Sequence, residues 1–315
     1  MSYKHLKEIE TLDNKDIYYF TKNDDHKFIN TISEINSRLK YKPASKDESK
    51  KTIVHWGQRK LFISELEFLI RYYPKDFDFT KKKFYILYVG SAKGTHLLYL
   101  CKLFPEFNFI LFDPAHFDTR LQYLDNVKII NKYFEDSDLE EYSDKEKYEN
   151  LIFISDIRYP NLSENDLDKQ QDYVKTDMDL QKKWYLKLNP YKALLKFRLP
   201  WNKEQCEYLD GKIYLQCWAG RQSTETRLVP NGKMKIYDNN KYEQKMFYFN
   251  KVIRRKIYGE KTKIVFNSCG HCYDCYKEFV TFYSYCKLKN IKLENFKINE
   301  MSHKLSSCLG YNNKF

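Results

Sequence analysis

The stretch FYILYVGSAKGTHLLYLCKLFPEFNFILFD, residues 84–113, decides the fold class of this chain. It consists of an apolar run over 84–90, a turn with two glycines, a helical pattern over 95–104 and a second apolar run over 107–113. Short continuous apolar runs predict strands that are buried on both faces. A strand, a helix and a second strand in this order are typical of a parallel sheet. We therefore expect an α/β fold, with helices on both faces of a mostly parallel sheet.

The same alternation of strands and helices extends along the chain on both sides of this stretch. We predict a helix over 58–72, because apolar residues recur there at helical spacing. Further on we predict strands over 126–134, 149–156 and 191–200, a helix over 166–188, strands over 212–220 and 226–230, and a helix over 238–257. Three of the strands end in Gly90, Asp113 and Asp156. Ligands of such sheets bind beyond the carboxyl ends of the strands, so we expect chemistry at these three positions.

Composition and charge favour a globular protein that binds nucleic acid. The chain has 315 residues, of which 42% are hydrophobic, and this suffices for a full core. The formal net charge of +12 favours polyanionic partners, and the 28 tyrosines suit stacking on bases. No run approaches about 18 apolar residues, and the polar start is unlike a signal peptide. We therefore expect no membrane span and a cytoplasmic, reducing location.

Sequence patterning divides the chain into three parts. They are a polar N-terminal arm (1–50), the α/β domain (51–258) and a C-terminal extension that contains cysteines (259–315). In the extension, Cys269, Cys272 and Cys275 have a spacing like that of zinc ligands. Two Cys-x-x-Cys steps that share Cys272 are not a normal zinc knuckle, so we favour free thiols there over a structural zinc ion.

The turn between the first strand and its helix carries a weak signal for a nucleotide-type cofactor. Gly90 lets a ligand approach the backbone, and Gly94 lets the helix start close to the strand. Asp113 ends the second strand about 20 residues further on, where an acid accepts from ribose hydroxyls. This pattern does not separate a nicotinamide cofactor from S-adenosylmethionine. The alternative for Asp113 is a helix N-cap or a turn residue.

Four charged residues in separate parts of the chain carry the catalytic hypothesis: Lys60, Asp156, Lys196 and Glu225. Lys196 stands out, because an unpaired charge inside an apolar strand is costly. In this order the four residues resemble the Lys-Asp-Lys-Glu tetrad of RNA 2′-O-methyltransferases. The surrounding segments narrow the resemblance to the poxvirus-type cap-specific mRNA 2′-O-methyltransferases, which also serve as poly(A) polymerase regulatory subunits. These segments are GQRKL (57–61), YVGSAKGTH (88–96), ISDIR (154–158), LKFRLPW (195–201), ETRL (225–228) and YEQKMFYFNK (242–251).

The resemblance implies a Rossmann-like S-adenosylmethionine-dependent methyltransferase. Its substrate is the ribose 2′-hydroxyl of the first transcribed nucleotide of capped mRNA, and Lys196 is the base or the group that stabilises the forming alkoxide. The resemblance assigns Gln58, Tyr88, Gly90, Gly94, His96, Asp113 and Asp156 to the cofactor pocket. Lys93 and Ala115 stand where the family has proline and arginine, so one cofactor contact is lost or comes from another residue.

The resemblance also implies a pocket that recognises the cap. A methylated guanine is cationic and stacks well between aromatic rings. Tyr41 and Trp201 match the two aromatic positions, and Glu243 matches an acid that reads the edge of the base. Arg198 and Arg227 flank catalytic positions and are our candidates for contacts to the downstream RNA. The family pattern is broken at Gln222, which replaces a tyrosine, and at Asn202 and Lys203, where an acid is expected.

Three alternatives stay open from the sequence. The chain could be a non-enzymatic, RNA-binding processivity subunit of a poly(A) polymerase. This role can also coexist with methyl transfer. In either case we expect the catalytic subunit of such a polymerase as a partner. It could methylate uncapped or ribosomal RNA by the same chemistry. A nicotinamide oxidoreductase is the third alternative, but it leaves Lys60, Lys196 and Glu225 unexplained.

Overall fold

The computed structural model describes residues 29–42, 56–158, 167–220, 222–257, 273–292 and 295–310. The chain divides into two compact units. One comprises 72–215 and 224–244, and we call it the sheet unit. The other comprises 1–71, 216–223 and 245–315, and we call it the helical unit. None of the helices in the described ranges is long and apolar enough to cross a membrane.

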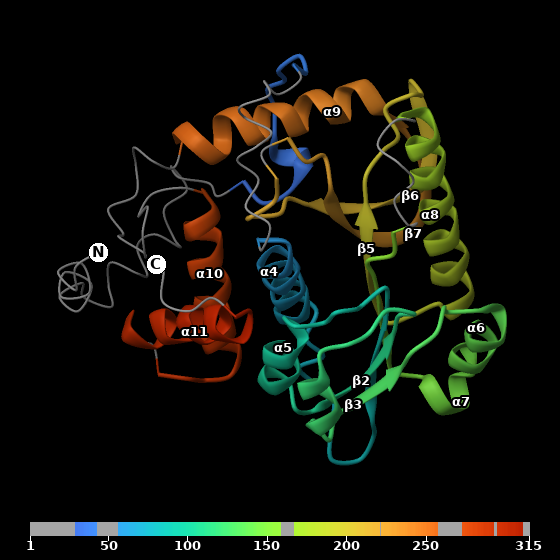
Figure 1. Cartoon of the computed structure of the whole chain (residues 1–315), viewed down its shortest axis with the longest axis vertical. Coiled ribbons are helices and arrows are strands. Elements are labelled where there is room, and N and C mark those ends of the chain that lie inside the picture. Colours follow the sequence, from blue (N-terminus) through green and yellow to red (C-terminus); the bar gives the residue numbers. More distant parts are fainter. Residues whose placement is uncertain are drawn as a thin grey trace. The chain divides into compact units, whose positions relative to one another are not determined.

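A seven-stranded sheet forms the centre of the sheet unit (Figure 1). Its strands are β1 (Phe84–Val89), β2 (Phe107–Phe112), β3 (Val127–Ile130), β4 (Leu151–Ser155), β5 (Lys192–Phe197), β6 (Gln205–Tyr214) and β7 (Thr226–Asp238). Their order is β3-β2-β1-β4-β5-β7-β6. The first five strands are parallel, whereas β7 is antiparallel to both β5 and β6. The direction of strand order reverses between β1 and β4, and ligands of doubly wound sheets bind beyond the strand ends at this point.

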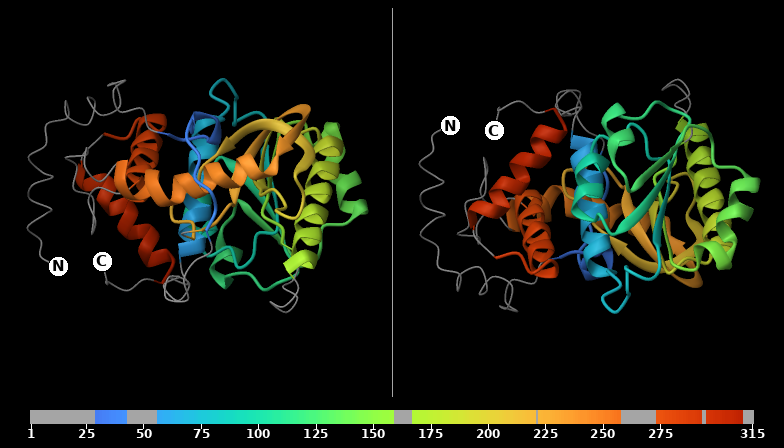
Figure 2. Two further views of the ribbon diagram at one scale, coloured as in Figure 1. Left: turned by 90° about the horizontal axis from the view of Figure 1, so that it is seen from above. Right: turned by 90° about the horizontal axis from the view of Figure 1, so that it is seen from below.

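Helices cover both faces of this sheet, as predicted. The helix α5 (Leu97–Leu103) lies on one face, and α6 (Asp136–Ser143), α7 (Lys145–Tyr148) and α8 (Leu167–Leu188) lie on the other (Figure 2). The strands between them are apolar on both faces, and every residue of β4 is buried. Because both faces are covered, these strands read as continuous apolar runs in the sequence.

Aromatic side chains fill the core near the start of β1 and β2. The rings of Phe84 and Phe107 are both buried and lie 5.5 Å apart at 65°. Tyr191, just before β5, contacts Phe84 in an edge-to-face arrangement. Such pairs contribute beyond the area that they bury. The aromatic content of the chain is therefore used in part for packing.

The strands at the edge depart most from the sequence prediction. The predicted strand over 212–220 is β6, which begins at Gln205 and ends at Tyr214, and the predicted strand over 226–230 extends as β7 to Asp238. Strands β6 and β7 form a long hairpin, and most residues in the second half of β7 are exposed. Polar side chains therefore interrupt the apolar pattern from which a strand is predicted. The predicted helix over 238–257 is the α-helix α9 (Asn239–Tyr248), which continues as the π-helical segment η4 (Phe249–Ile257).

The helical unit is held together by buried ion pairs. It contains the short helix η2 (Ile32–Glu34), α4 (Trp56–Arg71), the end of α9 with η4, α10 (Tyr273–Leu288) and α11 (Asn295–Cys308). Arg59 of α4 forms a buried salt bridge with Glu278 of α10, and Glu67 of α4 pairs with Lys277 at 2.8 Å. These links group α4 with the C-terminal helices, so the chain divides differently from the predicted boundaries at residues 50 and 258. Ion pairs between residues far apart in the chain produce no local sequence pattern, so the division into two units could not be predicted from the sequence.

Candidate active site

Three of the four predicted catalytic residues meet at the carboxyl ends of the central strands. Asp156 directly follows β4, and β4 pairs with β5 in a register that places Ser155 beside Leu195. The next residue of β5, Lys196, therefore lies beside Asp156. Its Nζ is 3.1 Å from Oδ1 of Asp156 and 3.8 Å from Oε2 of Glu225. One amine thus contacts two carboxylates at the edge where the sheet order reverses.

Arg227 completes this cluster, and its position corrects our prediction. We expected it to contact RNA, but it is 2% exposed and lies opposite Lys196 in the β5–β7 ladder. Its Nη1 is 2.8 Å from Oδ1 of Asp156, and its Nη2 is 3.2 Å from Oε1 of Glu225. Burial disfavours its charged form, but the two carboxylates outweigh this effect and raise the pKa of Arg227. We call Asp156, Lys196, Glu225 and Arg227 the charge cluster.

The charge cluster contains two acids and two cations, so its formal charges cancel. An uncompensated charge in a buried site costs several kcal/mol, which explains why the acids and the cations come together. Arg158 adds an outer contact, with its Nη2 3.4 Å from Oε2 of Glu225. Since its side chain is largely exposed, this contact contributes little.

The fourth predicted catalytic residue, Lys60, belongs to the helical unit. It lies in α4 next to Arg59, and its carbonyl accepts a hydrogen bond of 2.8 Å from the Ser64 hydroxyl. Gln58, which we assigned to the cofactor pocket, lies in the first turn of the same helix. The participation of Lys60 and Gln58 in the active site therefore stays a prediction.

Gly90 ends β1 and closely approaches the backbone at Asp156. It has a positive φ of 83°, and a Cβ at this position would lie 2.7 Å from the amide nitrogen of Ile157. A side chain there would push apart the ends of β1 and β4. Gly94 has a positive φ of 67° in the same turn. The glycines thus bring the predicted cofactor turn against the catalytic strand end.

The carboxylate of Asp113 links the turns after β1 and β2. Its Oδ2 accepts from the backbone amide of Ala92 at 3.0 Å, and its Oδ1 accepts from that of Ala115 at 2.8 Å. A carboxylate has about four lone-pair sites, so it can accept further hydrogen bonds from a ligand. Two other residues that we assigned to the cofactor, Tyr88 and His96, have buried side chains in β1 and at the start of α5.

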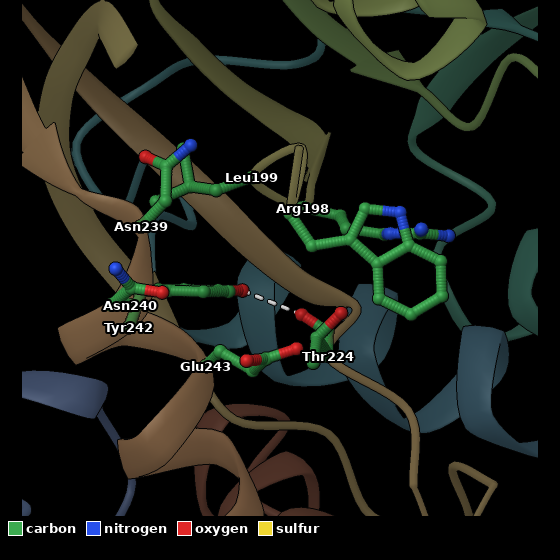
Figure 3. A pocket seen from close by; sticks show the side chains of 8 residues that line it. Arg198, Leu199, Thr224, Asn239, Asn240, Tyr242 and Glu243 are labelled. Atoms are coloured by element: carbon green, nitrogen blue, oxygen red, sulfur yellow. Dashed lines mark hydrogen bonds between the residues drawn. The ribbon is translucent and has the colours of Figure 1, made fainter. Parts of the chain in front are cut away.

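A hollow in the sheet unit lies just beyond β5 (Figure 3). The space in it and at its open mouth, solvent included, amounts to about 300 Å³. It is lined by Arg198, Leu199, Trp201, Thr224, Asn239, Asn240, Tyr242 and Glu243. Three predicted cap- or RNA-binding residues, namely Arg198, Trp201 and Glu243, are therefore brought together in one place. We call this hollow the aromatic pocket.

The aromatic pocket combines a ring, a cation and an acid. Trp201 is 45% exposed, and the guanidinium of Arg198 lies 5.4 Å from the centre of its ring. Burial lowers the pKa of Arg198 and raises that of Glu243, and the attraction between the two residues opposes both shifts. The Tyr242 hydroxyl donates to the carbonyl of Thr224 at 2.6 Å, which fixes the pocket wall (Figure 3). A planar cationic group would meet an aromatic face and a carboxylate here.

Tyr41, the other predicted cap-binding aromatic residue, lies in the helical unit. Its ring packs edge-to-face on Phe247 at 5.3 Å, and its hydroxyl donates to Oε1 of Gln222 at 3.5 Å. Gln222, the departure from the family pattern, therefore contacts the aromatic residue whose role it was expected to affect. That Tyr41 stacks on the cap stays a prediction.

The predicted zinc ligands cannot be compared as a set. Cys269 and Cys272 lie outside the described residues, whereas Cys275 is a buried cysteine in α10. The described ranges contain no group of three or more residues that could hold a metal ion.

Fold and site together define a Rossmann-like α/β protein with a paired charge cluster at the carboxyl edge of its sheet. The chain belongs to the poly A polymerase regulatory subunit family, whose model matches residues 25–308.

Individual proteins are also similar to this chain. A cap-specific mRNA (nucleoside-2′-O-)-methyltransferase of Myxoma virus (strain Lausanne) is 31% identical over 247 residues, which cover 72% of this chain and 70% of the relative. The protein of the same description from Fowlpox virus (strain NVSL) is 30% identical over 257 residues, which cover 76% and 78%. A solved structure of bluetongue virus VP4, described as a multifunctional RNA-capping production line, matches with a TM-score of 0.47 and 14% identity, over 68% of this chain and 33% of VP4.

Proposed function

We propose that this protein is a cap-specific mRNA 2′-O-methyltransferase that uses S-adenosylmethionine. The observation that carries the proposal is the contact of Lys196 with two carboxylates, beside the glycine turn that ends β1. The names of the Myxoma and Fowlpox virus relatives support this reaction and substrate. The alternative of a nicotinamide oxidoreductase leaves Lys196 and Glu225 unexplained.

The residues at the strand ends fit S-adenosylmethionine. The Asp113 carboxylate has acceptor capacity for ribose hydroxyls beyond the two backbone amides that it already binds. Gly90 and Gly94 have no side chain that would cover the backbone at these positions, and both adopt a positive φ that glycine tolerates. When bound, S-adenosylmethionine supplies a methyl group on a positively charged sulfur. We propose that Tyr88, His96 and Asp156 complete this pocket. On the basis of the resemblance alone, we propose Gln58 as a further residue that binds the cofactor.

The charge cluster would prepare the ribose hydroxyl for attack. Lys196 either accepts the hydroxyl proton or, while charged, donates a hydrogen bond to the oxygen as negative charge develops on it. Asp156 and Glu225 hold the amine in place, and Arg227 holds both carboxylates. Orientation of the nucleophile contributes a large part of the rate in such transfers. On the basis of the resemblance, we also propose Lys60 as a catalytic residue.

The aromatic pocket would recognise the methylated guanine of the cap. The exposed face of Trp201 offers stacking, and the carboxylate of Glu243 offers an acceptor and a negative charge. Both residues belong to the sheet unit that carries the charge cluster. The cap would thus anchor the RNA while the first transcribed ribose reacts.

A methyl-transfer assay on matched RNAs tests the proposal. Capped RNA whose first transcribed ribose carries a 2′-hydroxyl should accept methyl groups, whereas the same RNA with a 2′-hydrogen should not. Uncapped RNA of the same sequence should react poorly. Equal methylation of all three RNAs would refute the proposed site of transfer. Equal methylation of capped and uncapped RNA alone would favour the alternative of a 2′-O-methyltransferase for uncapped RNA.

We also propose a second role as the partner of a poly(A) polymerase. The family description and the net charge of +12 support it. The test is a copurification with the polymerase catalytic subunit, followed by measurement of tail length with and without this chain. A Lys196→Ala variant that lengthens tails normally but fails to methylate would show that the two roles are separate. The viral relatives favour cytoplasmic action for both roles.

A further inference from the structure

Helix α8 presents two buried glutamines to the segment that carries Lys196 and the aromatic pocket. Gln171 and Gln181 are each only 1% exposed. Ten residues separate them, which corresponds to about 15 Å along the helix. A buried amide is costly unless it is hydrogen-bonded, so the partners of each glutamine indicate what it holds in place.

Gln171 holds two elements of the aromatic pocket through one oxygen atom. Its Oε1 accepts from Nη2 of Arg198 at 3.0 Å and from the backbone amide of Trp201 at 3.4 Å. Arg198 is the cation that lies over the ring of Trp201. A single buried acceptor therefore holds both the backbone amide of Trp201 and the guanidinium of Arg198 that lies over its ring.

This hydrogen bond also decides where the charge of Arg198 points. Glu225 and Glu243 both attract this guanidinium. The hydrogen bond to the neutral oxygen of Gln171 holds Arg198 beside Trp201. In the absence of this hydrogen bond we expect the guanidinium to shift towards these acids, which would weaken the attraction of Glu243 for a cationic base.

Gln181 contacts the catalytic strand instead. Its Nε2 donates to the backbone carbonyl of Lys196 at 3.1 Å. On its other side, Lys196 is paired with Arg227 in the β5–β7 ladder. The backbone that carries the Lys196 amine is thus held by the sheet and by α8.

We infer that α8 is a positioning helix with two separate tasks: Gln171 sets the affinity of the aromatic pocket for a planar, cationic base, and Gln181 sets the rate of methyl transfer through Lys196. The inference rests on the proposed function. It follows from the distribution of contacts, because the described contacts of Gln171 are to the pocket and that of Gln181 is to the catalytic strand.

Two leucine substitutions of similar volume test this division. In Gln171→Leu, we expect the Kd for 7-methylguanosine triphosphate and the KM for capped RNA to rise about tenfold, as for the loss of a hydrogen bond to a charged group. Its kcat should stay within about twofold. In Gln181→Leu, we expect kcat to fall about tenfold while the Kd stays within about twofold. Thr176→Val is a matched control, because Thr176 is exposed on the same helix and its hydroxyl donates only to the Asp172 carbonyl.

The conservative variant Gln171→Glu sharpens the result. It keeps an acceptor for Arg198, so it should restore the affinity that Gln171→Leu loses. The inference is overturned if both leucine variants change Kd and kcat alike, or if they change only the melting temperature. If the wild-type protein itself fails to methylate capped RNA, the proposed function fails. In that case the Kd values for 7-methylguanosine triphosphate would still test the role of Gln171 in binding. The role of Gln181 in methyl transfer would be refuted, because there would be no methyl transfer to affect.

Discussion

Lys196 and Arg227 are cross-strand partners in β5 and β7, and both contact the same oxygen of Asp156, at 3.1 and 2.8 Å. Two cations share one carboxylate oxygen because Glu225 supplies a second negative charge beside them. The arrangement gives each cation a distinct role. Arg227 is almost fully buried and contacts both acids, whereas the side chain of Lys196 is 15% exposed, as the proposed catalytic role requires.

Substitution of Lys196 should abolish methyl transfer without preventing cofactor binding. In Lys196→Ala we expect kcat to fall by about 100-fold or more, because a positioned proton acceptor or donor is lost. The affinity for S-adenosylhomocysteine, measured by calorimetry, should change by less than about twofold. Lys192→Ala is the matched control, since Lys192 is at the opposite end of the same strand. Normal turnover by Lys196→Ala would refute its catalytic role.

Removal of Arg227 should destabilise the sheet unit. In Arg227→Leu we expect the free energy of unfolding to fall by about 3–5 kcal/mol, because two largely buried carboxylates lose their main cation. Urea denaturation followed by circular dichroism measures this change. Arg158→Ala removes the exposed cation that also contacts Glu225, and it should leave the unfolding midpoint nearly unchanged. Equal effects of the two substitutions would contradict the central position of Arg227.

Loss of the Trp201 ring should affect capped RNA selectively. In Trp201→Ala we expect the Kd for capped RNA to rise by tenfold or more, on the order of the 1–3 kcal/mol that a base stack contributes. The Kd for uncapped RNA should change little. Tyr133→Ala removes another exposed aromatic residue of the sheet unit and serves as the control. If Trp201→Ala weakens both RNAs equally, the pocket does not bind the cap.

The affinity for a cap analogue should depend on pH through Glu243. Burial raises the pKa of this carboxyl, so it becomes protonated at a higher pH than an exposed glutamate. A cationic base needs the carboxylate form. Affinity should therefore be full above this pKa and should fall, by up to about tenfold per pH unit, as the pH drops below it.

The Glu243→Gln variant provides the comparison for this pH dependence. It should bind 7-methylguanosine triphosphate more weakly at neutral pH and show a flatter profile at acidic pH. Binding of S-adenosylhomocysteine at the same pH values reports any general effect of acid. Identical profiles of variant and wild type would exclude Glu243 as the titrating group.

The buried ion pair of the helical unit should be important for stability. In Glu278→Ala the Arg59 guanidinium loses its buried carboxylate partner, and we expect about 3–5 kcal/mol less stability. Glu300→Ala removes a glutamate of α11 whose pairs with Lys297 and Lys304 are more exposed, so the change should be small. Thermal unfolding of both variants measures the two losses of stability. A larger loss of stability in Glu300→Ala than in Glu278→Ala would contradict the importance of the buried pair.

Much of the sheet could be predicted because its central strands are covered on both faces. Continuous apolar runs mark β1, β2 and β4, and their turns carry the glycine and the acids. The start of β6 was missed because polar and buried residues alternate there, which is the pattern of a half-covered edge strand and not a continuous apolar run. The division into two units was missed because the buried pairs of α4 join residues more than 200 positions apart.

The residues of the charge cluster, too, could be predicted from the sequence only in part. Asp156, Lys196 and Glu225 were identified by order and by resemblance, and the structure brings them together. The role of Arg227 was missed, although residues two apart in a strand share a face, and this spacing places it with Glu225. The register that sets it opposite Lys196 has no counterpart in the linear sequence. Gln171 was missed because a helical glutamine usually faces solvent.

The two units are interleaved along the chain: the short segment 216–223 belongs to the helical unit, although it connects β6 and β7 of the sheet unit. Neither unit is therefore encoded by one uninterrupted piece of the gene. A deletion that removes the last helices would take Glu278 away from Arg59 while leaving α4 in the protein. Loss of methylation in such a truncated protein would report damaged architecture rather than a reactive group in the deleted part, so point substitutions are the sounder way to dissect this enzyme.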